Sequence, residues 1–452
     1  MVTGPHLYLI LIFGVVFIVI ATVKFKLHPF LALLLASFGV GITAGVPLVD
    51  IVTAVNDGFG GIMGHIGIVI VSGTIIGKIL EKSGAAFRMA EVVLKVTGEK
   101  KPQLGMSLIG ALVSIPVFCD SAFVILSSLK KSIAIRTKVS QASMSIALAT
   151  GLYATHTLIP PTPGPIAAAG NLGAADYLGT VILMGLIVAV PTIFAGYFWA
   201  LKMADKISVV TDNESDLKYA EIFKDWGDLP SSAKAFLPIF LPIFLIGIGS
   251  VLRYLETSGT LSDLFVFIGT PTIALIIGIF SAFPLLPALN ETTLTGWIGE
   301  GLADSSIILL LTGAGGAFGA VIKETAIAET VTSLAESGTL EGAWILLIPF
   351  LIAAALKTAQ GSSTASIVIT SALLAPSLHQ AGITEAVPLS LMVMAIGAGA
   401  MAVSHVNDSY FWVVTQFSGI KLADGYRAHT LATLVQGLTA IAVTVLLWIL
   451  LV

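Results

Sequence analysis

Residues 114–126 read SIPVFCDSAFVIL, and they hold a carboxylate, Asp120, in the middle of a strongly apolar stretch. An ionised carboxylate is costly at membrane depth, so such a residue is by default a functional one. Basic residues flank the stretch, with Lys101 before it and Lys130 after it. The pattern is that of two short apolar helices separated by a polar break.

The composition of the chain places this break in a membrane protein. Only 11% of the 452 residues are charged and 56% are hydrophobic, with a mean hydropathy of +1.00. A soluble domain carries about 25% charged residues on its surface. The 22 basic and 26 acidic residues give a net charge of −4 without a basic stripe, which excludes nucleic-acid binding.

The cysteine and histidine pattern excludes several kinds of site. Cys119 is the only cysteine, so no internal disulfide forms, and no Cys/His cluster indicates zinc. We expect no metal site and no cofactor. Residues 1–6 contain no lysine or arginine, so we expect the first apolar run to be a retained helix and not a signal peptide.

The apolar runs define two halves, because a crossing helix needs roughly 20 mostly apolar residues. The first half offers Leu7–Val23, Leu27–Val49, Gly58–Gly77, Val139–Ala175 and Tyr177–Leu201. After a long polar segment the second half offers Ala235–Leu252, Leu264–Asn290, Ser305–Ile322, Gly342–Leu356, Thr358–Thr384, Ala386–Asn407 and Ala428–Val452. We predict an all-α polytopic membrane protein with a first transmembrane repeat in residues 1–201, a cytoplasmic linker in 202–234 and a second repeat in 235–452.

The positions of lysine and arginine orient these runs, because basic loop residues stay on the cytoplasmic side. With the N-terminus outside, all of the 22 basic residues except Arg253, Lys323 and Lys357 fall inside or beside the cytoplasmic ends of the runs. The acidic residues outside are Asp50, Asp57, Glu256, Glu329, Glu336 and Glu341. Residues 102–129 then lie between two cytoplasmic clusters, which predicts a re-entrant hairpin. The alternative is a single kinked crossing helix.

A weak internal repeat relates the two halves. Gly73 and Gly77 align with Gly315 and Gly319, and Asp120 then aligns with Ser362. A broken segment follows in each half, at 154–170 and at 402–419. Each half then has about five spans, a hairpin and a broken helix. Because five is odd, the two repeats are predicted to be inverted, an arrangement that places substrate at the midplane of secondary transporters. Chance similarity between apolar segments is the alternative.

Hydroxyl and amide residues near the predicted breaks are candidates for binding a polar substrate. Hydroxyls and free backbone N–H groups at helix N-termini bind a carboxylate without an arginine. Helix capping and close packing are the alternative roles. The candidate substrate-binding residues are Ser121, Thr155, Thr162, Gly361, Ser362, Ser363, Thr364 and Asn407.

Four titratable residues are candidates for carrying a coupled proton, in the order Asp120, Asp408, and then His156 and His405. Asp120 has the alternative role of capping the second hairpin helix. Each histidine has the alternative role of a hydrogen-bonded structural residue. Lys357 is the one basic residue near a hairpin tip, where it serves as a counter-ion or extends to the surface.

Four stretches resemble the gluconate permease family of bacterial proton symporters. They are PVFCDSAFVIL at 116–126, THTLIPPTPGPIAAAGNLGA at 155–174, LKTAQGSSTASIV at 356–368 and SHVNDSYFW at 404–412. The resemblance covers essentially the full chain. It implies uptake of gluconate or a related sugar acid with a proton across the bacterial inner membrane, by an elevator-like motion of a transport domain, and a possible homodimer.

Other functions remain open at this point. Relatives within the family carry D-serine or other hydroxy-acids, and hairpin carbonyls and hydroxyls also bind sodium, so a sodium-coupled carrier is an alternative. An anion channel also has re-entrant hairpins. A membrane enzyme is disfavoured, because the chain has no nucleophile and base at recognisable spacing, no H-E-x-x-H and no P-loop.

Overall fold

The computed structural model describes residues 2, 5–97, 101–204, 206–207, 209, 229–255, 259–325, 342–380, 382–406 and 408–452. Most of the predicted linker 202–234 and Asn407 lie outside the described residues, as do Glu256, Glu329, Glu336 and Glu341. Within the described ranges the regular structure is helical, apart from one isolated β-bridge between Val209 and Ile420. This confirms the predicted all-α class.

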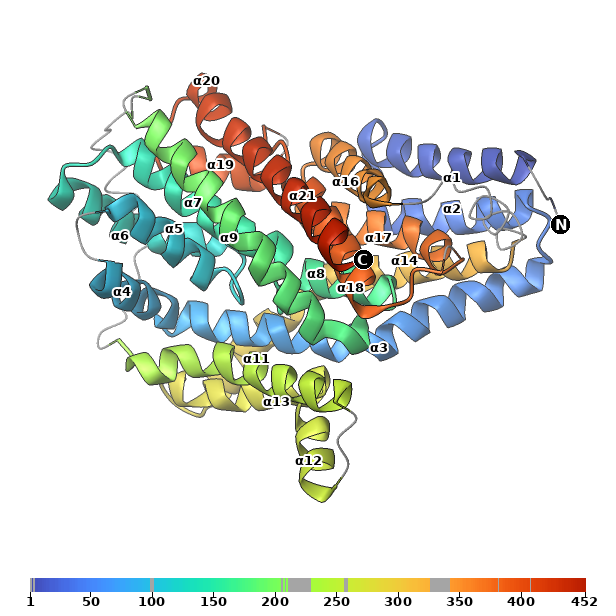
Figure 1. Ribbon diagram of the computed structural model, residues 1–452, viewed down its shortest axis with the longest axis horizontal. Coiled ribbons are helices and arrows are strands. Elements are labelled where there is room, and N and C mark those ends of the chain that lie inside the picture. Colours follow the sequence, from blue (N-terminus) through green and yellow to red (C-terminus); the bar gives the residue numbers. More distant parts are fainter. Residues whose placement is uncertain are drawn as a thin grey trace.

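The helices follow the apolar runs of the sequence (Figure 1). In the first half they are α1 (Pro5–Val23), α2 (Pro29–Thr43), α3 (Leu48–Lys82), α4 (Ala85–Thr97), α5 (Pro102–Val113), α6 (Cys119–Thr137), α7 (Gln141–Leu158), α8 (Pro163–Asn171) and α9 (Leu178–Met203). In the second half they are α11 (Ser232–Tyr254), α12 (Thr260–Ile268), α13 (Pro271–Ala282), α14 (Ile298–Lys323), α16 (Leu347–Gln360), α17 (Ser363–Gln380), α18 (Ala386–Met401), α19 (Ser409–Gln416), α20 (Leu422–Gly425) and α21 (Leu431–Leu451).

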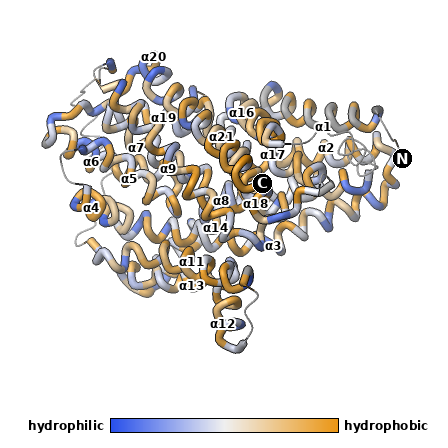
Figure 2. Tube along the Cα trace, viewed as in Figure 1, coloured by the Kyte–Doolittle hydropathy of each residue, from blue (hydrophilic) through white to orange (hydrophobic). Residues whose placement is uncertain are grey.

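Several of these helices are long and apolar enough to cross a membrane. Six described helical segments meet that criterion by length and composition, or seven if the bent pair α12–α13 forms one span. Figure 2 shows hydrophobic residues along most of the helices, with hydrophilic residues gathered at peripheral ends such as α4, α6 and α20. The chain is therefore a multi-pass membrane protein.

The helix breaks lie where the sequence predicts polar interruptions. Pro160 and Pro161 supply no N–H groups, so α7 ends at Leu158 and α8 begins at Pro163. In the second half α18 ends at Met401 and α19 begins at Ser409.

The two predicted hairpins are pairs of helices around a short break. Helices α5 and α6 contact each other and both pack on α7, as the predicted hairpin requires. Helices α16 and α17 also contact each other. They are separated by Gly361, whose φ of +87° is a left-handed conformation that glycine adopts without strain. The inverted orientation of the two halves stays a prediction.

Helices α3 and α14 pack closely on each other. A Cβ atom on Gly58 would collide with the carbonyl oxygen of Gly316, and one on Gly316 would lie 2.5 Å from the carbonyl oxygen of Gly58. The reciprocal contact requires glycine on both helices. It brings the two backbones together beside α8 and α17.

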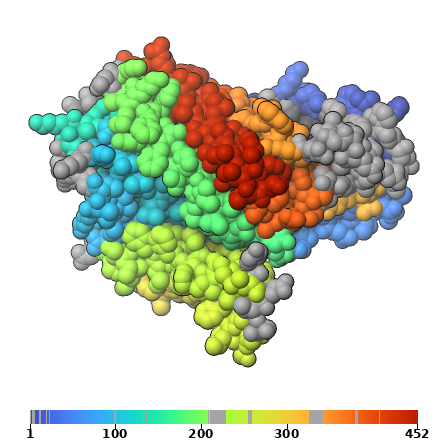
Figure 3. Space-filling view, viewed as in Figure 1, coloured from blue at the N-terminus to red at the C-terminus, as the bar shows by residue number. Residues whose placement is uncertain are grey.

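The apolar run Leu264–Asn290 differs from the single helix that its length suggests. It contains α12 and α13, which are bent by 69° at Gly269 and Thr270. A Cβ on Gly269 would lie 2.5 Å from the carbonyl oxygen of Leu245, so the bend sits where α11 approaches closely. In Figure 3 the segment α11–α13 forms a separate lobe on one side of the visible face.

Candidate functional site

A cavity of about 250 Å³ lies where the breaks of the two halves meet. We call it the site cavity. Its walls come from the start of α6, from the last turns of α7, from the break between α16 and α17, and from the start of α19. It is lined by Phe118, Cys119, Asp120, Tyr153, His156, Gln360, Gly361, Ser362, Ser363, Thr364, Asp408, Ser409 and Tyr410.

Three helices begin at the site cavity, namely α6, α17 and α19. At the start of α17 the Ser362 hydroxyl accepts a hydrogen bond from the backbone N–H of Ala365 at 3.2 Å. At the start of α19 the Asp408 carboxylate accepts one from the N–H of Tyr410 at 3.1 Å. The first N–H groups of a helix attract anions. The backbone therefore gives this cavity the character of an anion site.

A buried ion pair stands at the wall of the site cavity. The Lys357 ammonium lies 2.5 Å from Asp408 Oδ2 and donates to the carbonyl oxygen of Gly361 at 2.5 Å. The two side chains are 1% and 5% exposed. Lys357 therefore does not extend to the surface, and it acts as the counter-ion of Asp408.

Two residues that the sequence analysis missed stand behind this ion pair. The Ser404 hydroxyl donates to Asp408 Oδ2, and His429 Nε2 lies 3.0 Å from the Ser404 oxygen. Because Ser404 gives its only proton to Asp408, His429 is the donor in the second bond. His429 is fully buried, but it follows Arg427 at the edge of the predicted run Ala428–Val452, so the local sequence carried no signal for it.

Asp120 has much weaker polar partners than Asp408. Its Oδ1 accepts a hydrogen bond from the Ser409 hydroxyl at 3.3 Å, and the Cys119 thiol is 3.7 Å from Oδ2. No basic side chain in the described ranges forms an ion pair with it. The alternative role as a helix cap is wrong, because the N-cap of α6 is Phe118 and Asp120 lies within the first turn.

The two candidate histidines have different positions. His156 lines the site cavity beside the Phe118 ring, with centroids 5.9 Å apart, and its buried Nδ1 has no hydrogen-bond partner among the described residues. His405 does not line the cavity, and its Nε2 lies 2.8 Å from the carbonyl oxygen of Thr358. No three His, Cys, Asp or Glu side chains of the described chain gather as a metal site.

Four of the predicted substrate-binding residues line the site cavity, and these are Gly361, Ser362, Ser363 and Thr364. Ser121, Thr155 and Thr162 do not line it. The hydroxyls of Thr155 and Thr162 are directed at backbone carbonyls, those of Leu152 at 3.4 Å and Ile159 at 2.5 Å.

Other cavity-lining residues were not predicted, namely Phe118, Cys119, Tyr153, Gln360, Ser409 and Tyr410. Gln360 is notable among them, because its Nε2 is a buried donor without a partner in the described structure. A buried donor of this kind is costly unless a ligand or water accepts from it.

Comparisons with known proteins agree with this architecture. The family model described as GntP family permease matches residues 6–451. The D-serine transporter DsdX of Escherichia coli K12 is 35% identical over 445 residues, covering 97% of both chains. The gluconate permease of Pseudomonas aeruginosa is 30% identical over 418 residues, covering 91% of both chains.

Two further similarities concern location and fold. The inner membrane permease YgbN of Escherichia coli K12 is 32% identical over 453 residues, covering 96% of this chain and 97% of the relative. The YdaH transporter of Alcanivorax borkumensis, whose crystal structure has an unusual topology, superimposes with a TM-score of 0.66 at 14% identity, covering 92% of this chain and 97% of the other. The resemblance noted in the sequence is thus confirmed, and the chain belongs to the GntP family of permeases, as a multi-pass protein of the inner membrane and not an enzyme.

Proposed function

We propose that the chain imports gluconate or a related small sugar acid together with a proton. The observation that carries this proposal is the convergence of three helix N-termini at the site cavity, together with one buried donor that lacks an acceptor. The N-termini of α6, α17 and α19 meet there, and Gln360 Nε2 is buried and unpaired. A similar relative, the gluconate permease of Pseudomonas aeruginosa, supports the choice of substrate.

In this proposal the substrate carboxylate binds the helix N-termini and does not bind a lysine. The Lys357 ammonium is already neutralised by Asp408. The hydroxyl groups of the substrate then interact with Ser363 and Thr364 and with the amide of Gln360, which line the same cavity. Asn407 stays a predicted further partner.

Charge balance supports proton coupling at Asp120. Because Lys357 and Asp408 cancel each other, the site cavity carries the single negative charge of Asp120. A bound carboxylate adds a second negative charge, and two like charges repel strongly where water is scarce. A proton on Asp120 removes this repulsion. Substrate and proton therefore favour each other's binding, which is the requirement for symport.

We further propose that the hairpins and broken helices move together as the transport domain. The site cavity is built by α6, α7, α16, α17 and α19, with contributions from both the proposed repeats 1–201 and 235–452. Helices α6, α7 and α19 pack on one another and α16 packs on α17, while α3, α14 and α2 form a second packed group that α17 also contacts. An elevator-like displacement of the first group against the second would carry the cavity across the membrane. A homodimer through the second group is part of the same proposal.

Uptake of labelled gluconate into proteoliposomes tests the function. An inward proton gradient is imposed in sodium-free buffer, with and without an uncoupler. We expect accumulation above the external concentration that the uncoupler abolishes. If accumulation occurs only when sodium is added, sodium and not the proton is the coupling ion. Uptake that stops when the internal concentration of gluconate equals the external one would favour a channel.

D-serine is the second candidate substrate, because the D-serine transporter DsdX is 35% identical to this chain. Both molecules present one carboxylate and at least one hydroxyl. Competition separates them in the same vesicles: unlabelled D-serine that blocks gluconate uptake at a lower concentration than gluconate itself would make D-serine the preferred substrate.

A further inference from the structure

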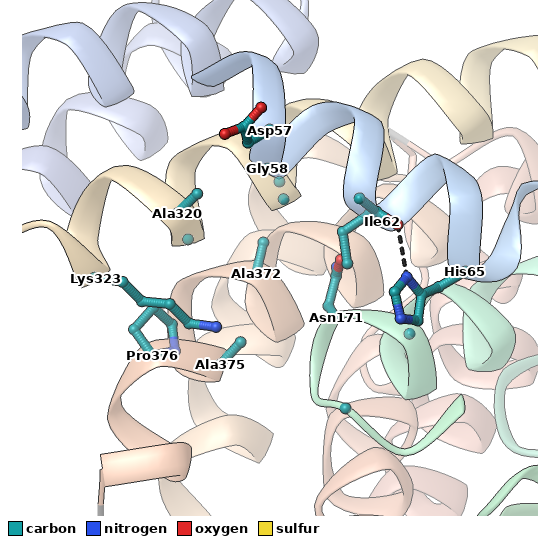
Figure 4. A pocket seen from close by; sticks show the side chains of 16 residues that line it. Asp57, Gly58, Ile62, His65, Asn171, Ala320, Lys323, Ala372, Ala375 and Pro376 are labelled. Carbon is teal, nitrogen blue, oxygen red and sulfur yellow. Dashed lines mark hydrogen bonds between the residues drawn. The ribbon is translucent and has the colours of Figure 1, made fainter. Parts of the chain in front are cut away.

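A second cavity, of about 260 Å³, lies between the α3–α14 pair and the far parts of α8 and α17 (Figure 4). We call it the second cavity. Helix α17 connects it with the site cavity, since Thr364 lines the site cavity and Ala372 lines the second one. Eight residues of helix correspond to about 12 Å. The two cavities therefore lie at different levels along the same helix.

Asn171, at the end of α8, provides an unsatisfied acceptor in the second cavity. The side chain is 8% exposed, and its Nδ2 donates to the carbonyl oxygen of Val368 at 3.3 Å and to the Ser371 hydroxyl at 2.9 Å. These two bonds fix the orientation of the amide. Asn171 Oδ1 is then buried without a partner in the described structure. A ligand that carries a hydroxyl group would satisfy it.

Lys323, the last residue of α14, provides a positive charge at the same cavity. In Figure 4 its side chain extends over the cavity near Ala375, while the Asp57 carboxylate points away at the upper edge. No carboxylate of the described residues forms an ion pair with the Lys323 ammonium. The positive charge is therefore available to an anion.

Most of the residues that line the second cavity are small, which leaves space for such a ligand. Glycines from α3 and α14 line much of it. A Cβ atom added at Gly61 would meet no atom within 4 Å, so that position faces open space.

We propose that the second cavity is a binding site for a small hydroxylated carboxylate, with the carboxylate at Lys323 and a hydroxyl donating to Asn171 Oδ1. It would be a second station for the transported molecule, on the far side of the packed starts of α8 and α17. Helices α8 and α17 pack on each other there, and a Cβ on Gly164 would lie 3.9 Å from Thr364 Cα. The identity of the ligand rests on the proposed function, whereas the preference for an anion does not.

Site-directed labelling tests the anion preference first. Cys119 is the only cysteine, so Cys119→Ser followed by Gly61→Cys leaves a single thiol at the second cavity. Its reaction rates with a sulfonate-bearing and with a trimethylammonium-bearing methanethiosulfonate are compared in nanodiscs. We expect Lys323→Gln to lower the ratio of the sulfonate rate to the trimethylammonium rate about 5-fold, because one nearby positive charge is lost. The matched control is Lys421→Gln, at an exposed lysine away from the cavity, which leaves the ratio unchanged.

Protection of the same thiol tests the ligand class. Gluconate is expected to slow the sulfonate reaction at a lower concentration than propionate, which has a carboxylate but no hydroxyl for Asn171. If Lys323→Gln leaves the ratio of the sulfonate rate to the trimethylammonium rate unchanged, the proposed second site is wrong, even if the protein accumulates gluconate. A ratio that responds, when gluconate gives no protection and the protein with Cys119 retained does not import gluconate, would keep the anion site and remove gluconate from both proposals.

Discussion

The two halves of the chain each place one carboxylate at the site cavity, and the surroundings of these carboxylates differ. Asp408 accepts bonds from Lys357, Ser404 and the N–H of Tyr410, all inside the protein. Asp120 accepts only from the Ser409 hydroxyl and, weakly, from the thiol of its neighbour. Donors and an opposite charge stabilise the ionised form of a carboxylate, and Asp408 has more such partners than Asp120. We therefore keep Asp120 as the proposed carrier of the coupled proton, and Asp408 as the partner of Lys357 in the buried ion pair.

The largest effect is expected from breaking the buried ion pair. Lys357→Met or Asp408→Asn alone leaves one uncompensated charge, which costs about 3–5 kcal/mol when a buried pair is broken. We expect each single variant to lower the unfolding temperature strongly and to abolish uptake. Thermal unfolding of the purified protein in detergent measures the first effect.

The double variant Lys357→Met/Asp408→Asn is the control for that experiment. It leaves no charge behind, and the amide oxygen introduced by Asp408→Asn would still accept from the N–H of Tyr410. We expect it to recover a large part of the lost stability. Single variants that unfold at the temperature of the unmodified protein would contradict the assignment of a structural ion pair.

The second-largest effect is expected from Asp120→Asn, and it concerns proton-coupled accumulation and not the stability of the protein. Asp120→Asn removes the carboxylate that has no cationic partner in the described structure, so the unfolding temperature should stay near its original value. Gradient-driven accumulation should fall to equal concentrations inside and outside, and uptake should lose its dependence on external pH. Asp120→Glu, which keeps the titratable group, should retain part of the accumulation. An Asp120→Asn protein that still accumulates substrate with a proton gradient would exclude Asp120 as the carrier.

Much of this arrangement was visible in the sequence because it depends on local chemistry. Prolines at 160 and 161 break a helix wherever they occur, and an aspartate in an apolar stretch at 120 marks a site. The ion pair was not visible, because Lys357 and Asp408 are far apart in the chain and meet only through packing.

The sequence also could not predict which hydroxyl groups face the site cavity. Thr155 and Thr162 lie near a predicted break, as Thr364 does, but the packing of the helices and of the break decides which side chains face the cavity. Gln360 was missed because nothing in the local sequence distinguishes a glutamine with an unpaired amide from one on the surface.

A smaller effect is expected from Gln360, the donor that we assign to substrate. Gln360→Met removes one hydrogen bond to the ligand, worth roughly 0.5–1.5 kcal/mol, so KM for uptake should rise about 2- to 10-fold. The stability of the empty protein should not fall, because a buried unpaired donor disappears. Thr162→Val is the matched control outside the cavity, and its KM should change less than 2-fold. Equal KM values for the two variants would contradict the placement of the substrate.

The smallest effect is expected at His429, which contacts the ion pair only through Ser404. His429→Phe loses the bond between Nε2 and the Ser404 oxygen but keeps an aromatic ring beside Tyr410, 5.3 Å away between centroids. It also removes Nδ1, a buried atom without a partner in the described part of the chain, which offsets the lost bond. The net change in stability should stay within about 1 kcal/mol. Uptake should fall only slightly, and its response to the proton gradient should remain. If the folded variant no longer responds to the proton gradient, the coupled proton would have to be assigned to the His429–Ser404–Asp408 chain of the second half and not to Asp120 of the first. The roles proposed for the two carboxylates would then be exchanged.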